Sequence, residues 1–222
     1  MRRRSPAPRP APRVRDMPAP RRNESVAGSF MQKAFGWPYR AILAGLYRLG
    51  VRPWQLTVAS LATNAAAGVL LVRGGRLVPG LLLIPAGMFD IFDGSVARLR
   101  GEAKRSGAFL DSVLDRVSDT VLFGCLFWSL AAEGHDLEAA LALTTLVGAL
   151  MVSHLRAEAE AAGVSLTEGW FQRLERYLAL MVGLIVPAAL LPVLVLLAAL
   201  GGVTVAQRVY AAWRRLRPTP AA

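Results

Sequence analysis

Long apolar segments separated by short polar links constrain the fold of this chain more than any other feature. Several of these segments approach the roughly 20 residues that an α-helix needs to cross a bilayer. The chain has 222 residues, of which 54% are hydrophobic, and its mean hydropathy is +0.41. This composition is too apolar for an ordinary soluble domain of the same length. We therefore predict an all-α integral membrane domain and no second folded domain.

The apolar segments predict six transmembrane helices, preceded by an amphipathic helix that lies at the membrane interface. The interfacial helix is expected over residues 29–49, where apolar side chains alternate with basic ones and a glycine and a proline follow. The six spans are expected near residues 54–72, 77–100, 107–132, 137–162, 170–186 and 190–213.

The distribution of the net charge of +11 predicts the topology. Residues 1–28 are rich in Arg and Pro, which predicts a disordered basic tail that contacts anionic lipid headgroups rather than nucleic acid. The membrane domain is expected over 29–217, followed by a short tail, 218–222. Basic residues gather after the second and fourth spans and at the C-terminus, and only Arg73 and Arg76 depart from this pattern. The positive-inside rule then places both termini in the cytoplasm.

Five aspartates lie inside this apolar sequence at regular spacing. A carboxylate at bilayer depth costs about 2.5–3.5 kcal/mol on insertion scales, so a cluster of carboxylates indicates a function. Residues three or four apart share one face of a helix, and the two predicted helices that carry the aspartates are joined by a short turn. The aspartates are Asp90, Asp93, Asp111, Asp115 and Asp119.

The first four of these carboxylates are predicted to converge on metal ions. An all-oxygen set suits hard cations such as Mg²⁺ or Mn²⁺, and a two-metal arrangement suits displacement at phosphorus. Asp119 continues the same stripe one turn further along. Its role stays open among direct metal binding, a supporting contact, and an ion pair with Arg116 or another cation.

Small and basic residues beside the aspartates predict a ligand that carries a diphosphate. Gly94 and Ala97 remove side-chain bulk next to the carboxylates, and Gly107 leaves room for a nucleotide ring at the start of the next helix. Arg98 is suited to forked hydrogen bonds with phosphate oxygens. Together with the carboxylates, these residues predict a site for a metal-bound diphosphate.

These residues match the spacing D-x2-D-G-x2-A-R-x8-G-x3-D-x3-D, the signature of the CDP-alcohol phosphatidyltransferase family. The chain resembles that family from about residue 29 to residue 217. The resemblance implies a homodimer in a bacterial inner membrane that uses CDP-diacylglycerol and releases CMP. It implies that Asp90, Asp93, Asp111 and Asp115 hold two Mg²⁺ or Mn²⁺ ions per active site, and that Asp115 is also the general base.

The resemblance also implies the residues that bind CDP. The family uses the turn that enters the first span, where Trp54 and Gln55 replace a more usual small polar or acidic residue. Lys104 stands where a Ser or Thr often contacts the nucleotide. The implied CDP-binding residues are Gly94, Ala97, Arg98, Gly107, Lys104, Pro53, Trp54, Gln55 and Thr57.

The acceptor side is similar to the phosphatidylinositol phosphate synthase branch of that family. The similarity implies that Ser153, Arg156, Arg173 and Arg176 bind the phosphate of a polyol phosphate, with inositol 1-phosphate as the expected acceptor. Glu158 replaces an arginine of that branch, and Leu174 replaces a proline. Glycerol 3-phosphate therefore stays open as an alternative acceptor.

Three other classes of protein also carry acidic or membrane features of this kind. Buried carboxylates mark the path of a divalent-cation transporter, but Arg98 beside them would repel the ion. A non-catalytic membrane scaffold would be favoured by the loss of a signature aspartate, and none is lost. A soluble isoprenoid enzyme with Asp-rich motifs conflicts with the hydropathy. We therefore expect a membrane transferase of phospholipid biosynthesis.

Overall fold

The computed structural model describes residues 14, 17–18, 26–166 and 173–216, in which helices are joined by short turns and links and no strand occurs. The predicted all-α class is confirmed. Most of the predicted tail 1–28 and the tail 218–222 lie outside the described residues. The helices are α1 (Val26–Arg48), α2 (Pro53–Val72), α3 (Leu77–Arg100), α4 (Arg105–Ala132), α5 (Asp136–Ala161), α6 (Arg173–Ile185) and α7 (Leu190–Leu216), with a 3-10 turn, η2 (Pro187–Ala189), before α7.

Each of the six predicted spans coincides with one of the helices α2 to α7, although residues 170–172 of the fifth lie outside the described residues. Among the described residues, four helical segments are long and apolar enough to cross a membrane, namely α2, α3, α5, and α7 together with η2. Helix α4 carries three aspartates between Arg105 and Asp119, and the described part of α6 has 13 residues. The structure thus supports a membrane protein with four candidate spans, and the count of six stays a prediction.

Helix α1 forms where an interfacial helix is expected, and it begins at Val26, three residues before the predicted start of the membrane domain. It packs against α3, where the rings of Tyr39 and Phe92 stack with their centroids 5.0 Å apart. Leu43 and Met17 are buried in the same apolar group. These contacts attach α1 to the bundle, and its position at a membrane interface stays a prediction.

The link between α3 and α4 is short because α3 ends in a left-handed residue. Gly101 has φ 69°, a conformation that glycine adopts without steric cost, and its N–H donates to the carbonyls at the end of α3. Helix α4 then begins at Arg105. The chain therefore reverses within four residues, which sets the second half of α3 beside the first half of α4.

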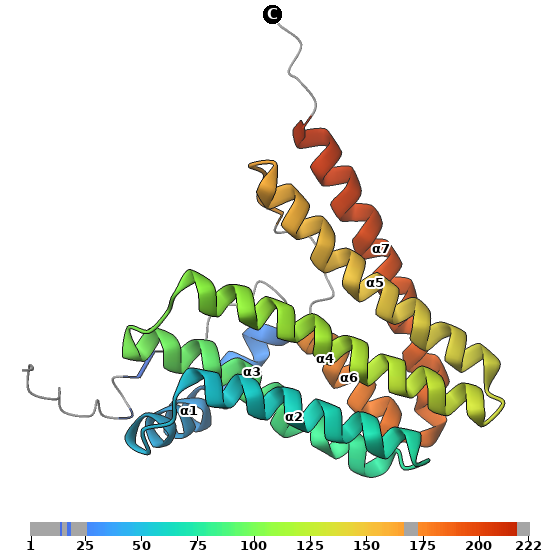
Figure 1. Cartoon of the computed structure of the whole chain (residues 1–222), viewed down its shortest axis with the longest axis horizontal. Helices are drawn as coiled ribbons and strands as arrows, with labels where there is room; N and C mark the ends of the chain where they lie inside the picture. Colours follow the sequence, from blue (N-terminus) through green and yellow to red (C-terminus); the bar gives the residue numbers. More distant parts are fainter. Residues whose placement is uncertain (1–13, 15–16, 19–25, 167–172, 217–222) are drawn as a thin grey trace, which may run out of the picture.

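The helices form a bundle of α2, α3, α4 and α6, with α5 packed on α4 and α7 packed on α5 and α6 (Figure 1). Helix α2 contacts α3 and α4, α3 contacts α6, and α5 contacts α4 and α7. In Figure 1, α5 and α7 diverge from the other helices toward the end where the chain terminates. Fully buried core side chains include Leu71, Leu122, Phe123, Leu126, Leu180, Leu184 and Leu194.

This core includes α4 from Leu122 onward and leaves the preceding part of the helix, with its aspartates, outside the apolar cluster. The outward faces of the helices are apolar as well. Contiguous apolar surface of this extent is unfavourable in water and favourable against lipid. Exposed examples are Val58, Val69, Leu81, Ile84, Val147, Val195 and Leu196.

Helices α3 and α6 approach each other closely at Gly80. A Cβ atom at this position would lie 2.9 Å from Ile185 Cγ1 and 3.0 Å from Leu184 Cβ. Neither atom is the flexible end of a side chain, so a methyl group here would push the helices apart. We expect Gly80→Ala to lower the free energy of unfolding by about 1–3 kcal/mol, measured by thermal unfolding in detergent.

Gly87→Ala is the matched control in the same helix, because a Cβ atom there meets nothing within 4 Å. Its unfolding temperature should be unchanged or slightly raised. Equal losses of stability in the two variants would contradict the close approach of α3 and α6 at Gly80.

Candidate active site

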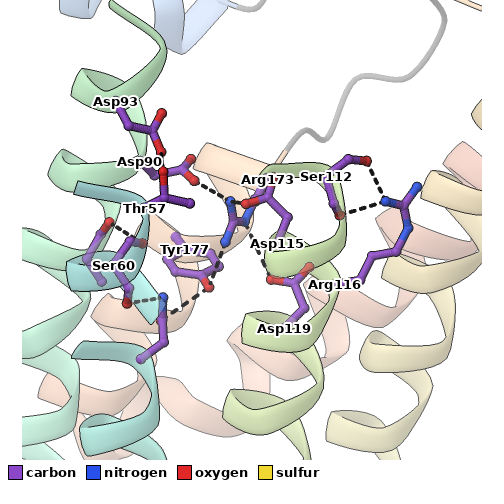
Figure 2. A network of polar contacts seen from close by, with 12 residues as sticks. Thr57, Ser60, Asp90, Asp93, Ser112, Asp115, Arg116, Asp119, Arg173 and Tyr177 are labelled. Carbon is purple, nitrogen blue, oxygen red and sulfur yellow. Dashed lines mark hydrogen bonds and ion pairs between the residues drawn. The ribbon is translucent and has the colours of Figure 1, made fainter. Parts of the chain in front are cut away.

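Polar side chains from four helices meet at one end of the bundle (Figure 2). Asp90 and Asp93 come from the second half of α3, and the aspartates of α4 precede the part of that helix that enters the apolar core. Thr57 lies near the start of α2, and Arg173 is the first residue of α6. Because the short link between α3 and α4 reverses the chain, residues at the end of one helix face residues at the start of the next.

Three of the four carboxylates that are predicted to converge come together. One oxygen from each of Asp90, Asp93 and Asp111 lies within 4.8 Å of the other two. The hydroxyl of Thr57 donates to Asp93 Oδ2 at 2.9 Å, which orients that carboxylate. Asp111 Oδ1 is buried and has no hydrogen-bond partner among the described residues. Three hard oxygen donors, one of them with an unused buried atom, fit a divalent metal ion.

Asp115, the fourth predicted metal ligand, contacts Arg173 rather than joining this group of three. Arg173 Nη1 donates to Asp115 Oδ1 and also to Asp90 Oδ1, the latter at 2.6 Å. The Arg173 side chain is only 20% exposed. Its guanidinium therefore bridges a carboxylate of α3 and a carboxylate of α4, and Figure 2 shows it between them.

Asp119 pairs with two arginines of α6, one of the outcomes that the sequence left open. Its Oδ2 lies 3.1 Å from Arg176 Nη2, and its Oδ1 lies 3.6 Å from Arg173 Nε. Asp119 is 5% exposed and Arg176 is 6% exposed, so this is a buried cluster of charges. Arg116, which was the other candidate partner, instead donates to the carbonyl of Ser112 at 2.6 Å.

A chain of hydrogen bonds links Arg173 to α2 and α3. Arg173 Nη2 lies 3.5 Å from the hydroxyl of Tyr177, which donates to Asn64 Oδ1 at 3.2 Å. Asn64 Nδ2 donates to the carbonyl of Ser60, and the Ser60 hydroxyl donates to the carbonyl of Ala86, both at 3.0 Å. Sequence reasoning did not find Asn64 and Tyr177. In the sequence, Asn64 could have been noticed as an amide within a mostly apolar stretch of α2.

The residues predicted to bind the diphosphate lie on the last turns of α3 and the first turn of α4. Arg98 is exposed, and its Nη2 donates to Ser95 Oγ at 3.0 Å. The hydroxyl of Tyr39 also donates to Ser95 Oγ, at 2.7 Å, which ties α1 to this region. A Cβ atom at Gly94 would lie 3.3 Å from Arg98 Nη1, whereas one at Gly107 would meet nothing within 4 Å. Packing between the described residues therefore does not require a glycine at position 107.

The turn that enters α2 is capped by its own residues. Gln55 Oε1 accepts a hydrogen bond from the backbone N–H of Arg52 at 2.8 Å, and Pro53 opens the helix. Trp54 is exposed, as is Lys104, which precedes the first turn of α4. Of the predicted residues in this turn, Thr57 contacts the carboxylate cluster directly.

The predicted acceptor residues fall into two groups. Arg173 and Arg176 lie within the buried cluster, whereas Ser153 and Arg156 belong to α5. The Ser153 carbonyl lies 3.4 Å from Nη2 of Arg116 on α4, so this part of α5 lies beside the site. Arg156 is exposed, and its Nε lies 2.9 Å from Glu160 Oε1.

The chain matches the model of the CDP-alcohol phosphatidyltransferase family over residues 51–211. A phosphatidylinositol phosphate synthase from Mycobacterium marinum is 33% identical over 199 residues, which cover 85% of each protein. An archaetidylinositol phosphate synthase from Pyrococcus horikoshii is 34% identical over 181 residues, 81% of this chain and 93% of that protein.

Solved structures of a phosphatidylinositol phosphate synthase from Mycobacterium tuberculosis have a similar fold. The structure with CDP-DAG bound has a TM-score of 0.72 and 29% sequence identity, over 82% of this chain and 98% of that one. The structure in complex with manganese and citrate has a TM-score of 0.71 and 31% identity, over 78% of this chain and 88% of that one.

The hydrogen bond between Tyr177 and Asn64 should appear as an energetic coupling. Asn64 is fully buried, so Asn64→Leu leaves the Tyr177 hydroxyl without its acceptor and should reduce the free energy of unfolding. Hydrogen bonds between membrane helices contribute about 1 kcal/mol. Tyr177→Phe should therefore cost less stability in the Asn64→Leu background than in the wild-type protein, because only its contact with Arg173 is still lost. Losses that simply add in the double variant, measured by chemical unfolding in detergent, would contradict the coupling.

Proposed function

This chain belongs to the CDP-alcohol phosphatidyltransferase family, and from that membership we propose that it transfers a phosphatidyl group from CDP-diacylglycerol to inositol 1-phosphate and releases CMP. One observation carries the proposal. Three carboxylates that fit a metal ion lie beside two buried arginines suited to phosphate, at one end of an apolar bundle. The names of the relatives, and the CDP-DAG bound to a solved relative, support the same substrates.

Asp90, Asp93 and Asp111 would hold the metal, with Asp115 as a further ligand, and we propose two ions of Mg²⁺ or Mn²⁺. Manganese is present in a solved relative of similar fold. When bound, such ions would neutralise charge on the phosphoryl oxygens and on the leaving group. Thr57 holds the Asp93 carboxylate in the orientation that the cluster requires.

In the proposed reaction, the acceptor hydroxyl oxygen forms a bond to the phosphorus that carries the diacylglycerol. The bond from that phosphorus to the bridging oxygen of the diphosphate breaks, and the bridging oxygen leaves with CMP. The proton of the acceptor hydroxyl passes to Asp115. A base must lie within hydrogen-bond reach of the proton that it accepts, so Asp115 acts once Arg173 has released its carboxylate.

Arg173 and Arg176 would bind the acceptor phosphate, because a guanidinium donates two parallel hydrogen bonds to phosphate oxygens. Ser153 and Arg156 would complete the acceptor pocket from α5. Glu158, whose charge could oppose phosphate binding, lies on an exposed part of α5 with its carboxylate 3.9 Å from His154. The names of the relatives support inositol 1-phosphate as the acceptor.

The CDP moiety would lie along the edge of the cluster near the link between α3 and α4. Arg98 is exposed there and suited to the diphosphate, and Gly107 offers open space beside the backbone. The full set that we propose for CDP binding is Gly94, Ala97, Arg98, Gly107, Lys104, Pro53, Trp54, Gln55 and Thr57.

We propose a homodimeric protein of the bacterial inner membrane, with six spans, an interfacial α1 and both termini in the cytoplasm. Arg73 and Arg76, at the opposite end of the bundle from the site, depart from the predicted charge pattern. Arg76 forms an ion pair with Glu133, so its charge is neutralised at that end. The basic residues in the links after α3 and α5 and at the end of α7 follow the positive-inside pattern and support a cytoplasmic position for the carboxylate cluster.

The test is CMP release from CDP-diacylglycerol by the purified protein in detergent with Mg²⁺. Inositol 1-phosphate, glycerol 3-phosphate, free inositol and serine are offered one at a time. We expect release with inositol 1-phosphate, and a loss of about 10²–10⁴-fold in Asp115→Asn because a general base is removed. Release only with glycerol 3-phosphate would contradict the proposed acceptor, and release unaffected by Asp115→Asn would contradict the proposed base.

Gly107→Ala tests the proposed approach of the nucleotide to α4. Because a Cβ atom there meets no protein atom within 4 Å, the variant should fold with unchanged or slightly higher stability. We expect its KM for CDP-diacylglycerol to rise about tenfold, the equivalent of 1.4 kcal/mol, while its KM for the acceptor stays the same. An unchanged KM for CDP-diacylglycerol would contradict a nucleotide site at this position.

A further inference from the structure

Arg173 faces carboxylates on two different helices with different atoms of its guanidinium. Its Nη1 contacts Asp90 and Asp115, the two residues that would also be needed by a metal ion. Its Nε lies 3.6 Å from Asp119 Oδ1. Arg173 can therefore release the first two carboxylates through Nη1 and keep its contact with Asp119 through Nε.

Asp119 is the one aspartate of the five that the proposed reaction does not use. It lies one helical turn beyond Asp115 on the same face of α4, and it is 5% exposed. Both of its oxygens lie near guanidinium nitrogens of α6, those of Arg173 and Arg176. Its place in the structure is thus beside the arginines rather than within the group of three carboxylates that fit a metal.

We propose that Asp119 is a positioning residue that holds Arg173 at the site when a divalent ion takes Asp90 and Asp115. The inference rests on the proposed function, because it requires these two carboxylates to bind metal. Arg173 and the ion compete for the same two carboxylates. Asp119 offers Arg173 an alternative counter-ion, so metal binding does not leave a buried guanidinium without a negative partner.

The energetic reason is the cost of a buried charge without a partner, which is several kcal/mol when one member of a buried ion pair is removed. Without Asp119, each metal ion that binds would impose this cost on Arg173. Once Asp90 and Asp115 hold metal, the carboxylate of Asp119 still faces the guanidinium groups of Arg173 and Arg176. The remaining single positive charge suits the phosphate of the acceptor, so metal binding would prepare Arg173 for that phosphate.

The test is Mn²⁺ binding to the full-length protein in detergent, measured by calorimetry without substrates. We expect Asp119→Asn to weaken Mn²⁺ binding about tenfold or more, the equivalent of at least 1.4 kcal/mol. In an Arg173→Gln background the competing cation is absent, so Asp119→Asn should weaken binding by less than about threefold, which is about 0.65 kcal/mol.

Two results would overturn the inference. One is an equal weakening by Asp119→Asn with and without Arg173, which would mean that Asp119 acts through its own charge or as a metal ligand. The other is unchanged Mn²⁺ affinity in Asp119→Asn. Asp136→Asn, at the opposite end of the bundle, controls for the loss of one carboxylate and should leave the affinity unchanged.

Asp119→Asn leaves Arg176 buried without its carboxylate, so a second pair of variants separates metal binding from a loss of folding. Asp119→Asn with Arg176→Gln removes both members of this ion pair and is compared with Arg176→Gln alone. We expect the same weakening of about tenfold between these two proteins, and equal affinities would overturn the inference. Wild-type protein that binds no Mn²⁺ would instead contradict the metal site of the proposed function.

Discussion

The bridge from Arg173 to carboxylates on α3 and α4 is the interaction on which the rest of the site depends. An apolar bundle tolerates a group of charges at one end only if the charges neutralise one another. Arg173 and Arg176 provide two positive charges against the aspartates, and both come from the first turn of α6. The start of α6 is thereby held against α3 and α4.

The apolar core that stabilises the fold and the polar site lie at different ends of the bundle. Apolar side chains of α2, α4, α6 and α7 fill the core beyond the first half of α4. At the other end, the site keeps buried atoms such as Asp111 Oδ1 that no described residue satisfies. Leaving polar atoms unsatisfied is unfavourable for folding, and it is the arrangement expected where a metal and a phosphate are to bind.

Much of the site could be predicted because its spacing is local. Asp90 and Asp93 share a helix face by their separation of three residues, and a short link ending at Gly101 brings Asp111 opposite them. Asn64 and Tyr177 could not be predicted in the same way. They are 113 residues apart, and each is a single polar group in its helix whose partner depends on how α2 and α6 pack.

The sequence by itself determined the all-α class, the positions of the helices and the family, because hydropathy and residue spacing act along one helix at a time. Only the tertiary structure decided which charges meet. It placed Arg173 on Asp90 and Asp115, directed Asp119 to the arginines of α6 rather than to Arg116, and set Glu158 on an exposed face. Partners on different helices depend on the rotation and closeness of packed helices, and helical periodicity within a single segment carries no information about either.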